Sequence, residues 1–133
     1  MVELMIIYTS DYVRNSKRNS LLVELKDNAN TAVTGKVFTD ITATVVRWGQ
    51  PPDSVTMVAL ANARAAFSAG GWAQLSAAQY PGLYRLDIPN TAFVNDGVTD
   101  NILVSVLCTG CQPVYVMIPL TDRDGSAGTR DRS

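Results

Sequence analysis

The residues with the most reactive side chains in this sequence are Cys108 and Cys111, which are separated by Thr109 and Gly110. A zinc site built on this pair would need histidines or a second cysteine pair as further ligands, and the chain contains neither. Redox-active cysteine pairs of this spacing lie at a helix N-terminus, whereas these two residues lie between strand-like segments. Three interpretations stay open: free thiols, a disulfide across the turn, and a link between subunits.

The chain has no histidine. It therefore lacks an imidazole base near neutral pH, a Ser-His or Cys-His nucleophile pair, and an imidazole ligand for zinc, copper or iron. Most hydrolase and metalloenzyme mechanisms need at least one of these groups. We expect a protein that is not an enzyme, with no catalytic residues, no metal, no cofactor and no small-molecule substrate.

The aromatic side chains that would suit a ligand surface are Trp48 and Trp72. Together they are candidates for a glycan platform, although isolated tryptophans in β-domains more often pack in the core or at an interface. Gly70 and Gly71 precede Trp72 without the lysine and helix of a phosphate-binding loop, so this stretch predicts a turn or bulge that leads Trp72 into a strand.

Charge and hydropathy exclude two classes of partner. The 133 residues carry 11 basic and 12 acidic side chains, for a net charge of -1, so no clustered basic field favours nucleic acid. The longest apolar run near the N-terminus, residues 4–8, is far shorter than the roughly 18 residues that a membrane-spanning helix needs. We therefore expect neither a nucleic-acid partner nor a membrane partner.

The elements that must position these residues are mostly strands, because apolar residues recur with a period of two. Residues 37–46 and 54–60 are expected to be antiparallel neighbours, and residues 102–108 and 114–120 a tight hairpin with Gly110 at a positive φ. Residues 59–68 and 91–94 are candidates for short helices. Further strands are expected at residues 3–8, 21–26 and 83–88.

The stretch from Tyr80 to Asn90 combines a turn signal with a strand. Pro81-Gly82 predicts a type II turn before a strand with Tyr84, Leu86 and Ile88 in the core. Arg85 and Asp87 then share the opposite face, where we expect a surface feature or a contact between subunits.

Many short strands with little helix predict an all-β fold, an antiparallel Ig-like β-sandwich of about seven or eight strands with one or two short connecting helices. We expect residues 1–20 to form an N-terminal strand or arm and a basic loop, residues 21–120 the sandwich, and residues 121–133 a disordered tail. The residues of this loop that we expect to contact another protein are Tyr12, Arg14, Lys17 and Arg18.

Several motifs along the chain resemble those of small Ig-like β-sandwich modules in virion proteins of tailed bacteriophages. They are R-x-G at residues 47–49, VTMVAL at 55–60, SAGGWAQL at 68–75, YPGLYRLDIP at 80–89 and VMIPL at 116–120. The likeness covers roughly residues 14–120, and its most specific parts are Gly70-Gly71-Trp72 and residues 81–89. The Cys108–Cys111 hairpin lies outside the pattern.

The resemblance implies a structural virion protein, and for a chain of this size a capsid decoration (cement) protein that stabilises the head shell. Its implied partners are the major capsid protein and its own copies, as a homotrimer or homodimer. Its implied location is the capsid surface, after synthesis in the cytoplasm of the bacterial host. The alternatives are a tail, baseplate or fibre adaptor and a glycan-binding β-sandwich on the virion surface.

Overall fold

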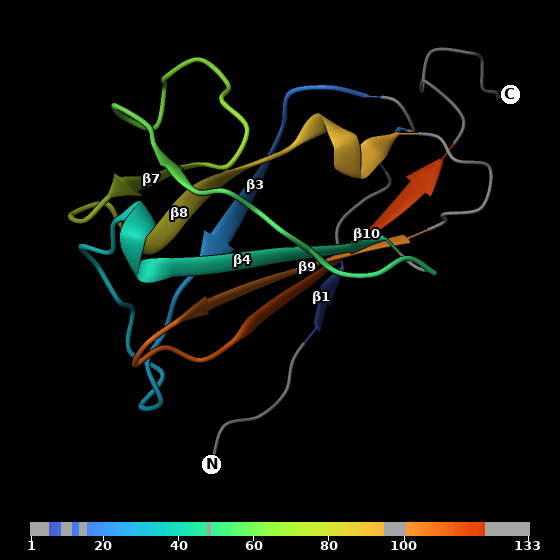
Figure 1. Cartoon of the computed structure of the whole chain (residues 1–133). Helices are drawn as coiled ribbons and strands as arrows, with labels where there is room; N and C mark the ends of the chain where they lie inside the picture. The colour runs from blue at the N-terminus through green and yellow to red at the C-terminus, as the bar shows by residue number, and fades with distance from the viewer. Residues whose placement is uncertain (1–5, 9–11, 14–15, 48, 95–100, 122–133) are drawn as a thin grey trace, which may run out of the picture.

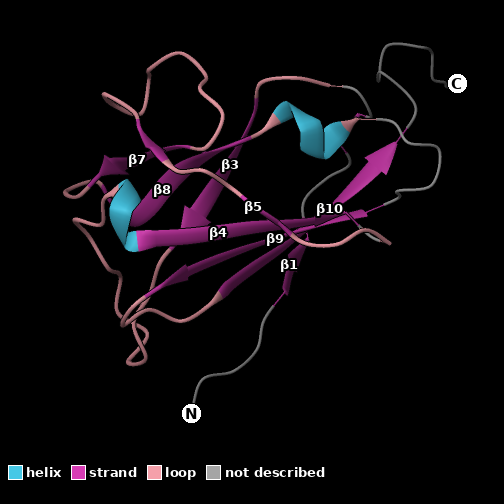
Figure 2. Cartoon of the chain, in the orientation of Figure 1, coloured by secondary structure: helices cyan, strands magenta, loops and turns pink. Residues whose placement is uncertain are grey.

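The computed structural model of the chain describes residues 6–8, 12–13, 16–47, 49–94 and 101–121. Strands dominate the described structure and form two sheets that face each other (Figures 1 and 2). Most neighbouring strands are antiparallel. The chain is an all-β sandwich, as the alternating apolar pattern predicts.

The first sheet has the strand order β1-β10-β9-β4-β5, and β2 also pairs with β10. Its strands are β1 (Ile6–Tyr8), β2 (Tyr12–Val13), β4 (Ile41–Arg47), β5 (Asp53–Ser54), β9 (Asn101–Cys108) and β10 (Val114–Thr121). Both β1 and β2 run parallel to β10. The N-terminal region is thus added to the edge of its own chain's sheet.

The second sheet has the strand order β3-β8-β7-β6. Its strands are β3 (Asn19–Glu24), β6 (Val58–Ala59), β7 (Gly71–Ser76) and β8 (Tyr80–Ile88). The long strand β8 lies between β3 and β7 and pairs antiparallel with both. This central position decides which side chains β8 buries on each of its faces.

The core lies between the two sheets and is filled by alternate residues of the strands. On β8, Tyr84, Leu86 and Ile88 are each 0% exposed, which confirms the predicted core face. The predicted pairing of β9 with β10 and the positive φ of Gly110, 83°, are confirmed. The hairpin is not tight, however, because its last pair joins Val106 to Val114 and residues 107–113 lie between them.

Of the two predicted helices, residues 91–94 are close to a short 3-10 helix, η2 (Asn90–Phe93). The prediction of a helix at residues 59–68 is wrong, because Val58–Ala59 is a strand and the rest consists of bends, turns and irregular backbone. The carbonyl oxygens of Ala63 and Ala65 accept hydrogen bonds from the Arg85 side chain instead of from helix amides. A tertiary partner has thus overridden the helix propensity of alanine.

The strand predicted at residues 37–46 begins four residues late, at Ile41. Before it lies a 3-10 helix, η1 (Phe38–Asp40), in which the Asp40 amide donates to the Val37 carbonyl at 2.9 Å. The Asp40 carboxylate in turn accepts from the Val37 amide, also at 2.9 Å. An aspartate that bonds nearby backbone competes with strand formation, which explains the shorter strand.

The single strand predicted at residues 54–60 is wrong, because this segment contributes to both sheets. Asp53–Ser54 pairs with β4 in the first sheet, while Val58–Ala59 pairs in parallel with β7 in the second. The chain therefore crosses from one sheet to the other within residues 55–57. Only the first of these two short strands is an antiparallel neighbour of β4.

The prediction of a turn at Pro81-Gly82 is wrong. Residues 77–79 make the turn, and Pro81 and Gly82 belong to β8. Gly82 has a φ of 83° at a register shift between β7 and β8. Its carbonyl accepts from the Leu25 amide at 2.8 Å. A Cβ at this position would lie 2.9 Å from the Leu25 carbonyl oxygen, so the glycine makes a bulge that lets β3 and β8 approach closely.

Candidate functional site

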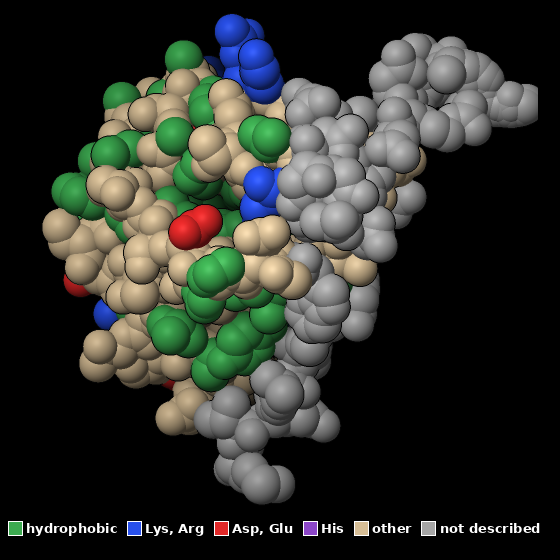
Figure 3. Space-filling view, turned by 45° about the vertical axis from the view of Figure 1, so that its right-hand side comes forward, with side chains coloured by type: hydrophobic (Ala, Val, Ile, Leu, Met, Phe, Trp, Pro, Cys, Tyr) green, Lys and Arg blue, Asp and Glu red, His purple; other side chains and the backbone are tan. Residues whose placement is uncertain are grey.

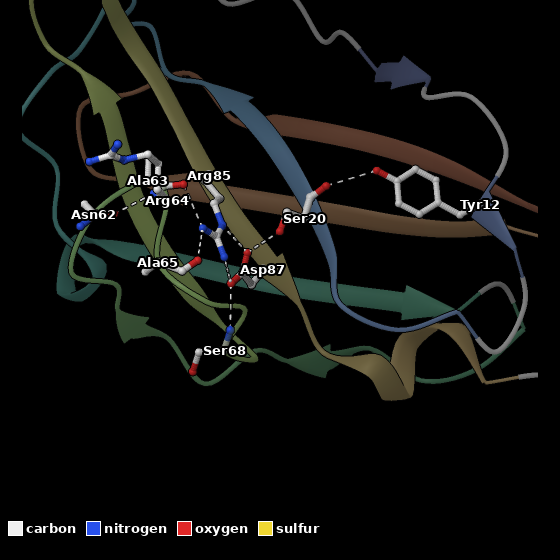
Figure 4. A network of polar contacts seen from close by, with 9 residues as sticks. All are labelled: Tyr12, Ser20, Asn62, Ala63, Arg64, Ala65, Ser68, Arg85 and Asp87. Atoms are coloured by element: carbon white, nitrogen blue, oxygen red, sulfur yellow. Dashed lines mark hydrogen bonds and ion pairs between the residues drawn. The ribbon is translucent and has the colours of Figure 1, made fainter.

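The most extensive polar cluster among the described residues lies on the outer face of β8, around Arg85 and Asp87 (Figure 4). The Arg85 Nε donates to Asp87 Oδ1 at 2.7 Å, and Nη2 donates to Oδ2 at 2.8 Å. Same-face residues two apart on a strand are close enough for this two-pronged contact, which holds both groups in one geometry.

Groups from two neighbouring segments complete the shell of the Asp87 carboxylate. The Ser20 hydroxyl, from β3, donates to Oδ1 at 2.6 Å, and the Ser68 amide donates to Oδ2 at 3.0 Å. The backbone carbonyl of Asp87 accepts from the Gly70 amide at 2.9 Å. Asp87 therefore joins β3, β8 and the segment that leads into β7.

The cluster holds residues 61–69 across the sheet, and we call this stretch the clasped segment. The Arg85 Nη1 donates to the Ala63 carbonyl at 3.0 Å and to the Ala65 carbonyl at 2.7 Å. Within the segment the Asn62 side chain accepts from the Arg64 amide at 2.8 Å. The backbone is thus fixed by the sheet below it, while the side chains of Asn62 and Arg64 remain exposed.

Burial and hydrogen bonding act in opposite directions on Asp87, whose exposed fraction is 0%. Burial alone would raise the pKa of this carboxyl. Hydrogen bonds from Arg85, Ser20 and the Ser68 amide, together with the Arg85 charge, outweigh burial and hold the pKa of Asp87 below its usual value. The carboxylate is therefore ionised and fully engaged, which suits a structural anchor better than a proton donor.

The prediction that Arg85 and Asp87 form an exposed surface pair is wrong. The Arg85 side chain is 12% exposed and Asp87 is inaccessible, because the clasped segment covers this part of the sheet. Sequence reasoning placed both residues on the correct face but missed the segment that covers them. The one available signal that it adopts another structure is Asn62 within the run of alanines, since asparagine bonds nearby backbone amides and is unfavourable inside a helix.

Cys108 and Cys111 are free thiols in the structure, as in the first of the three interpretations. The Cys111 amide donates to the Cys108 carbonyl at 3.0 Å, and both side chains pack partly against the core. Burial, followed by the hydrogen bond and charge of Cys108, raises the pKa of Cys111 to about 11. The link between subunits stays a prediction.

The tryptophan platform is not supported at Trp72, which is 3% exposed. Its ring stacks on Tyr84 with centroids 4.8 Å apart, and its Nε1 donates to the Lys36 carbonyl at 3.1 Å. Trp72 is a core residue that enters β7 after Gly70, whose φ of 81° confirms the predicted turn. Trp48 lies outside the described residues.

The predicted contact residues of the N-terminal loop have different environments. Tyr12 is half-buried and stacks on Phe93 with centroids 5.6 Å apart, and burial raises its pKa. Lys17 and Arg18 are exposed, so their predicted contacts stay predictions. Arg14 and the predicted tail at residues 122–133 lie outside the described residues.

One concave surface of the described residues lies beside Arg47. A pocket of about 500 Å³ between the sheets is lined by Arg47, Asp53 and Thr91 among others, and the Arg47 side chain donates to the carbonyls of Thr91 and Val94. Figure 3 shows charged side chains scattered among neutral and hydrophobic ones on one face. No large area of a single charge is visible there.

The described residues contain no group of three or more cysteine, aspartate or glutamate side chains placed to hold a metal ion. In the same ranges, no helix has the length and apolarity that crossing a membrane would require. Comparisons with protein-family models, curated proteins and solved structures gave no match to the chain.

Proposed function

We propose that this protein is a structural component of a tailed-phage virion that binds and stabilises the head shell as a capsid decoration protein. The proposal combines the sequence resemblance with one structural observation, the rigid clasped segment on the outer face of the second sheet. It assigns the protein a binding role and no catalysis.

The clasped segment has the properties of a preformed protein-binding surface. Its backbone is fixed through the Arg85 guanidinium and the Asp87 carboxylate, both of which are largely withdrawn from solvent. A segment that is already ordered loses little conformational entropy when it binds, so weak contacts contribute more to affinity. Short side chains such as Ala66 let another protein approach the backbone closely, and Arg64 adds one exposed charge.

Head binding is tested by sedimenting the purified chain with expanded phage heads that lack a decoration protein. The wild-type chain should co-sediment at a fixed ratio to the major capsid protein and raise the temperature at which the heads disrupt. A chain that stays in the supernatant at all ratios would overturn the proposal. Binding to isolated tails instead would also overturn it, in favour of the tail adaptor.

Two charge reversals locate the contact. Arg64→Glu alters the exposed side chain of the clasped segment, and Lys17→Glu is the matched change in the N-terminal basic loop. If the clasped segment contacts the shell, Arg64→Glu should weaken head binding by about tenfold while Lys17→Glu leaves it near the wild-type value. The reverse pattern would place the contact on the basic loop.

A further inference from the structure

The strand β3 forms an open edge of the second sheet. It pairs with β8 over its whole length, from Asn19 opposite Ile88 to Glu24 opposite Leu83. In the described residues no strand pairs with its other side. Unpaired strand edges present a row of amide and carbonyl groups to any strand that can align with them.

The hydrogen bonds around β3 show which residues face outward. The Leu25 amide donates to the Gly82 carbonyl on β8, and backbone groups of successive residues alternate in direction along a strand. Ser20, Leu22 and Glu24 therefore turn their backbone groups away from β8. In agreement, the Ser20 carbonyl accepts from the Tyr12 hydroxyl at 3.3 Å on the outer side of the strand (Figure 4).

The other edges of the described sheets are short or covered. β5 and β6 contain two residues each, and the outer side of β10 is taken by β1 and β2. β3 has six residues, NSLLVE, with no proline, no lysine and no register shift to β8. Short length, proline, lysine and bulges are the features that proteins usually employ to keep an edge strand from pairing, and β3 has none of them. Leu22 on this edge is 59% exposed.

We propose that β3 is the contact between two copies of this chain, which pair antiparallel about a two-fold axis at Leu22. The two second sheets then form one continuous sheet across the dimer. This inference concerns self-association only and does not depend on the proposed role in a virion.

The sequence of β3 is complementary to itself in this register. On the outer face, Leu22 lies opposite Leu22 of the second copy, so that each exposed side chain covers the other. Ser20 lies opposite Glu24 of the second copy, and on the inner face Leu21 lies opposite Val23. In this register the Ser20 carbonyl accepts from both the Tyr12 hydroxyl and the Glu24 amide of the second copy, because a carbonyl oxygen has two lone pairs. A register centred on Leu21 would leave the backbone groups of Glu24 without a strand partner, so pairing about Leu22 uses the edge most fully.

The mass of the full chain in solution tests the proposal, measured by analytical ultracentrifugation up to roughly 100 µM, where micromolar complexes are well populated. The wild-type chain should be a dimer. A monomer over the whole range, or a trimer, would overturn the inference.

Substitutions at Leu22 test the site itself. Leu22→Pro removes an amide that points away from β8, so it should abolish the dimer without breaking the sheet of the monomer. Leu22→Lys should do the same by placing like charges opposite each other at the axis, which covers the case in which the proline variant does not fold. Leu107→Lys is the matched control, because Leu107 is 42% exposed on the inner strand β9.

The two Leu22 variants should be monomers, whereas the Leu107 variant should remain a dimer. The thermal midpoints of the Leu22 variants should lie near that of the Leu107 variant. A dimer that persists in both Leu22 variants would contradict the assignment. Hydrogen exchange gives an independent readout: the amides of Leu22 and Glu24 should exchange more slowly as protein concentration rises, and exchange that is independent of concentration would also contradict it.

Discussion

The outer face of β8 and the end of the β9–β10 hairpin each hold a pair of reactive side chains, and the two pairs differ in how they are surrounded. Asp87 is inaccessible and accepts hydrogen bonds from Arg85, Ser20 and the Ser68 amide. Cys108 and Cys111 are half-buried on a turn. The first pair joins segments that are distant in sequence, whereas the second pair belongs to one local turn.

This difference has an energetic consequence. A buried charge that loses its partner keeps the cost of its desolvation, so the stability of the fold depends strongly on both members of the Arg85–Asp87 pair. A neutral thiol has no such cost, and its loss leaves only a small change in packing. Substitutions should therefore have large effects at the first pair and small effects at the second.

The largest expected effect comes from Arg85→Met, which removes the charge that pairs with Asp87 and the donors to Ala63 and Ala65. We expect the free energy of unfolding in urea to fall by about 3–5 kcal/mol. The double variant Arg85→Met/Asp87→Leu should be more stable than the single variant, because it leaves no unpaired buried charge. A single variant as stable as the wild type would show that the pair does not anchor the fold.

Acid should weaken the same pair in a predictable direction. The pKa of Asp87 in the folded chain is below its ordinary value of 3.8, so its stabilising contribution is present above about pH 4 and is lost as the pH falls through the folded value. Asp87→Asn should be less stable than the wild type at pH 7, and this difference should narrow as the pH is lowered.

Urea unfolding at a series of pH values measures that difference. The matched control is Asp53→Asn, which removes an exposed carboxylate on β5 and should follow the wild-type curve closely. A difference between wild type and Asp87→Asn that stays constant down to pH 3 would contradict the assigned ion pair.

The two regions also differ at their positive-φ glycines, Gly70 beside Asp87 and Gly110 between the cysteines, with φ of 81° and 83°. A Cβ at Gly70 would lie 1.9 Å from the Thr56 carbonyl oxygen, while nothing lies within 4 Å of one at Gly110. Gly110→Ala should cost only about 1 kcal/mol for the strained backbone, and Gly70→Ala about 3 kcal/mol because the Thr56 backbone must also move. Equal losses of unfolding free energy would contradict this ranking.

The sequence predicts those parts of the fold in which local pattern and tertiary environment agree. Alternation on β8 correctly identifies Tyr84, Leu86 and Ile88 as core residues, and the glycine at position 110 correctly marks a hairpin. Both signals depend on neighbours along the chain, namely the period of a strand and the backbone freedom of glycine.

The remaining parts depend on distant partners that no local pattern contains. The alternation of residues 54–60 continues while the chain passes from one sheet to the other, so the period alone cannot locate the crossing. Likewise, charged residues on one face of a strand predict a solvent-exposed face, because the sequence does not show that another segment covers it. The clasped segment covers β8 because Arg85 bonds its carbonyls, which is a contact across about twenty residues of chain.

The smallest effect on stability is expected at Cys111, where the measurable change is in reactivity. In the folded chain the pKa of this thiol is raised to about 11, against 9.0 for an ordinary cysteine, chiefly because the side chain is buried. The contribution of the neutral thiol to stability is therefore complete below about pH 9 and is lost as the pH rises towards 11. At pH 8 the folded protein should hold about a hundredfold less Cys111 thiolate than the unfolded chain.

Alkylation of the wild-type chain by iodoacetamide under reducing conditions measures that thiolate, with peptide mass spectrometry locating the label at Cys111 so that Cys108, which contributes to the raised pKa, stays in place. Labelling of Cys111 should be slow in the folded protein at pH 8, should accelerate between pH 9 and 11, and should reach the rate of an ordinary thiol in urea. Equal rates in folded and unfolded protein at pH 8 would show that the hairpin does not protect the thiol. In that case the surroundings of the hairpin would leave the chemistry of Cys111 unchanged. The contrast with Asp87, whose pKa is lowered by its surroundings, would then be larger than the structure implies.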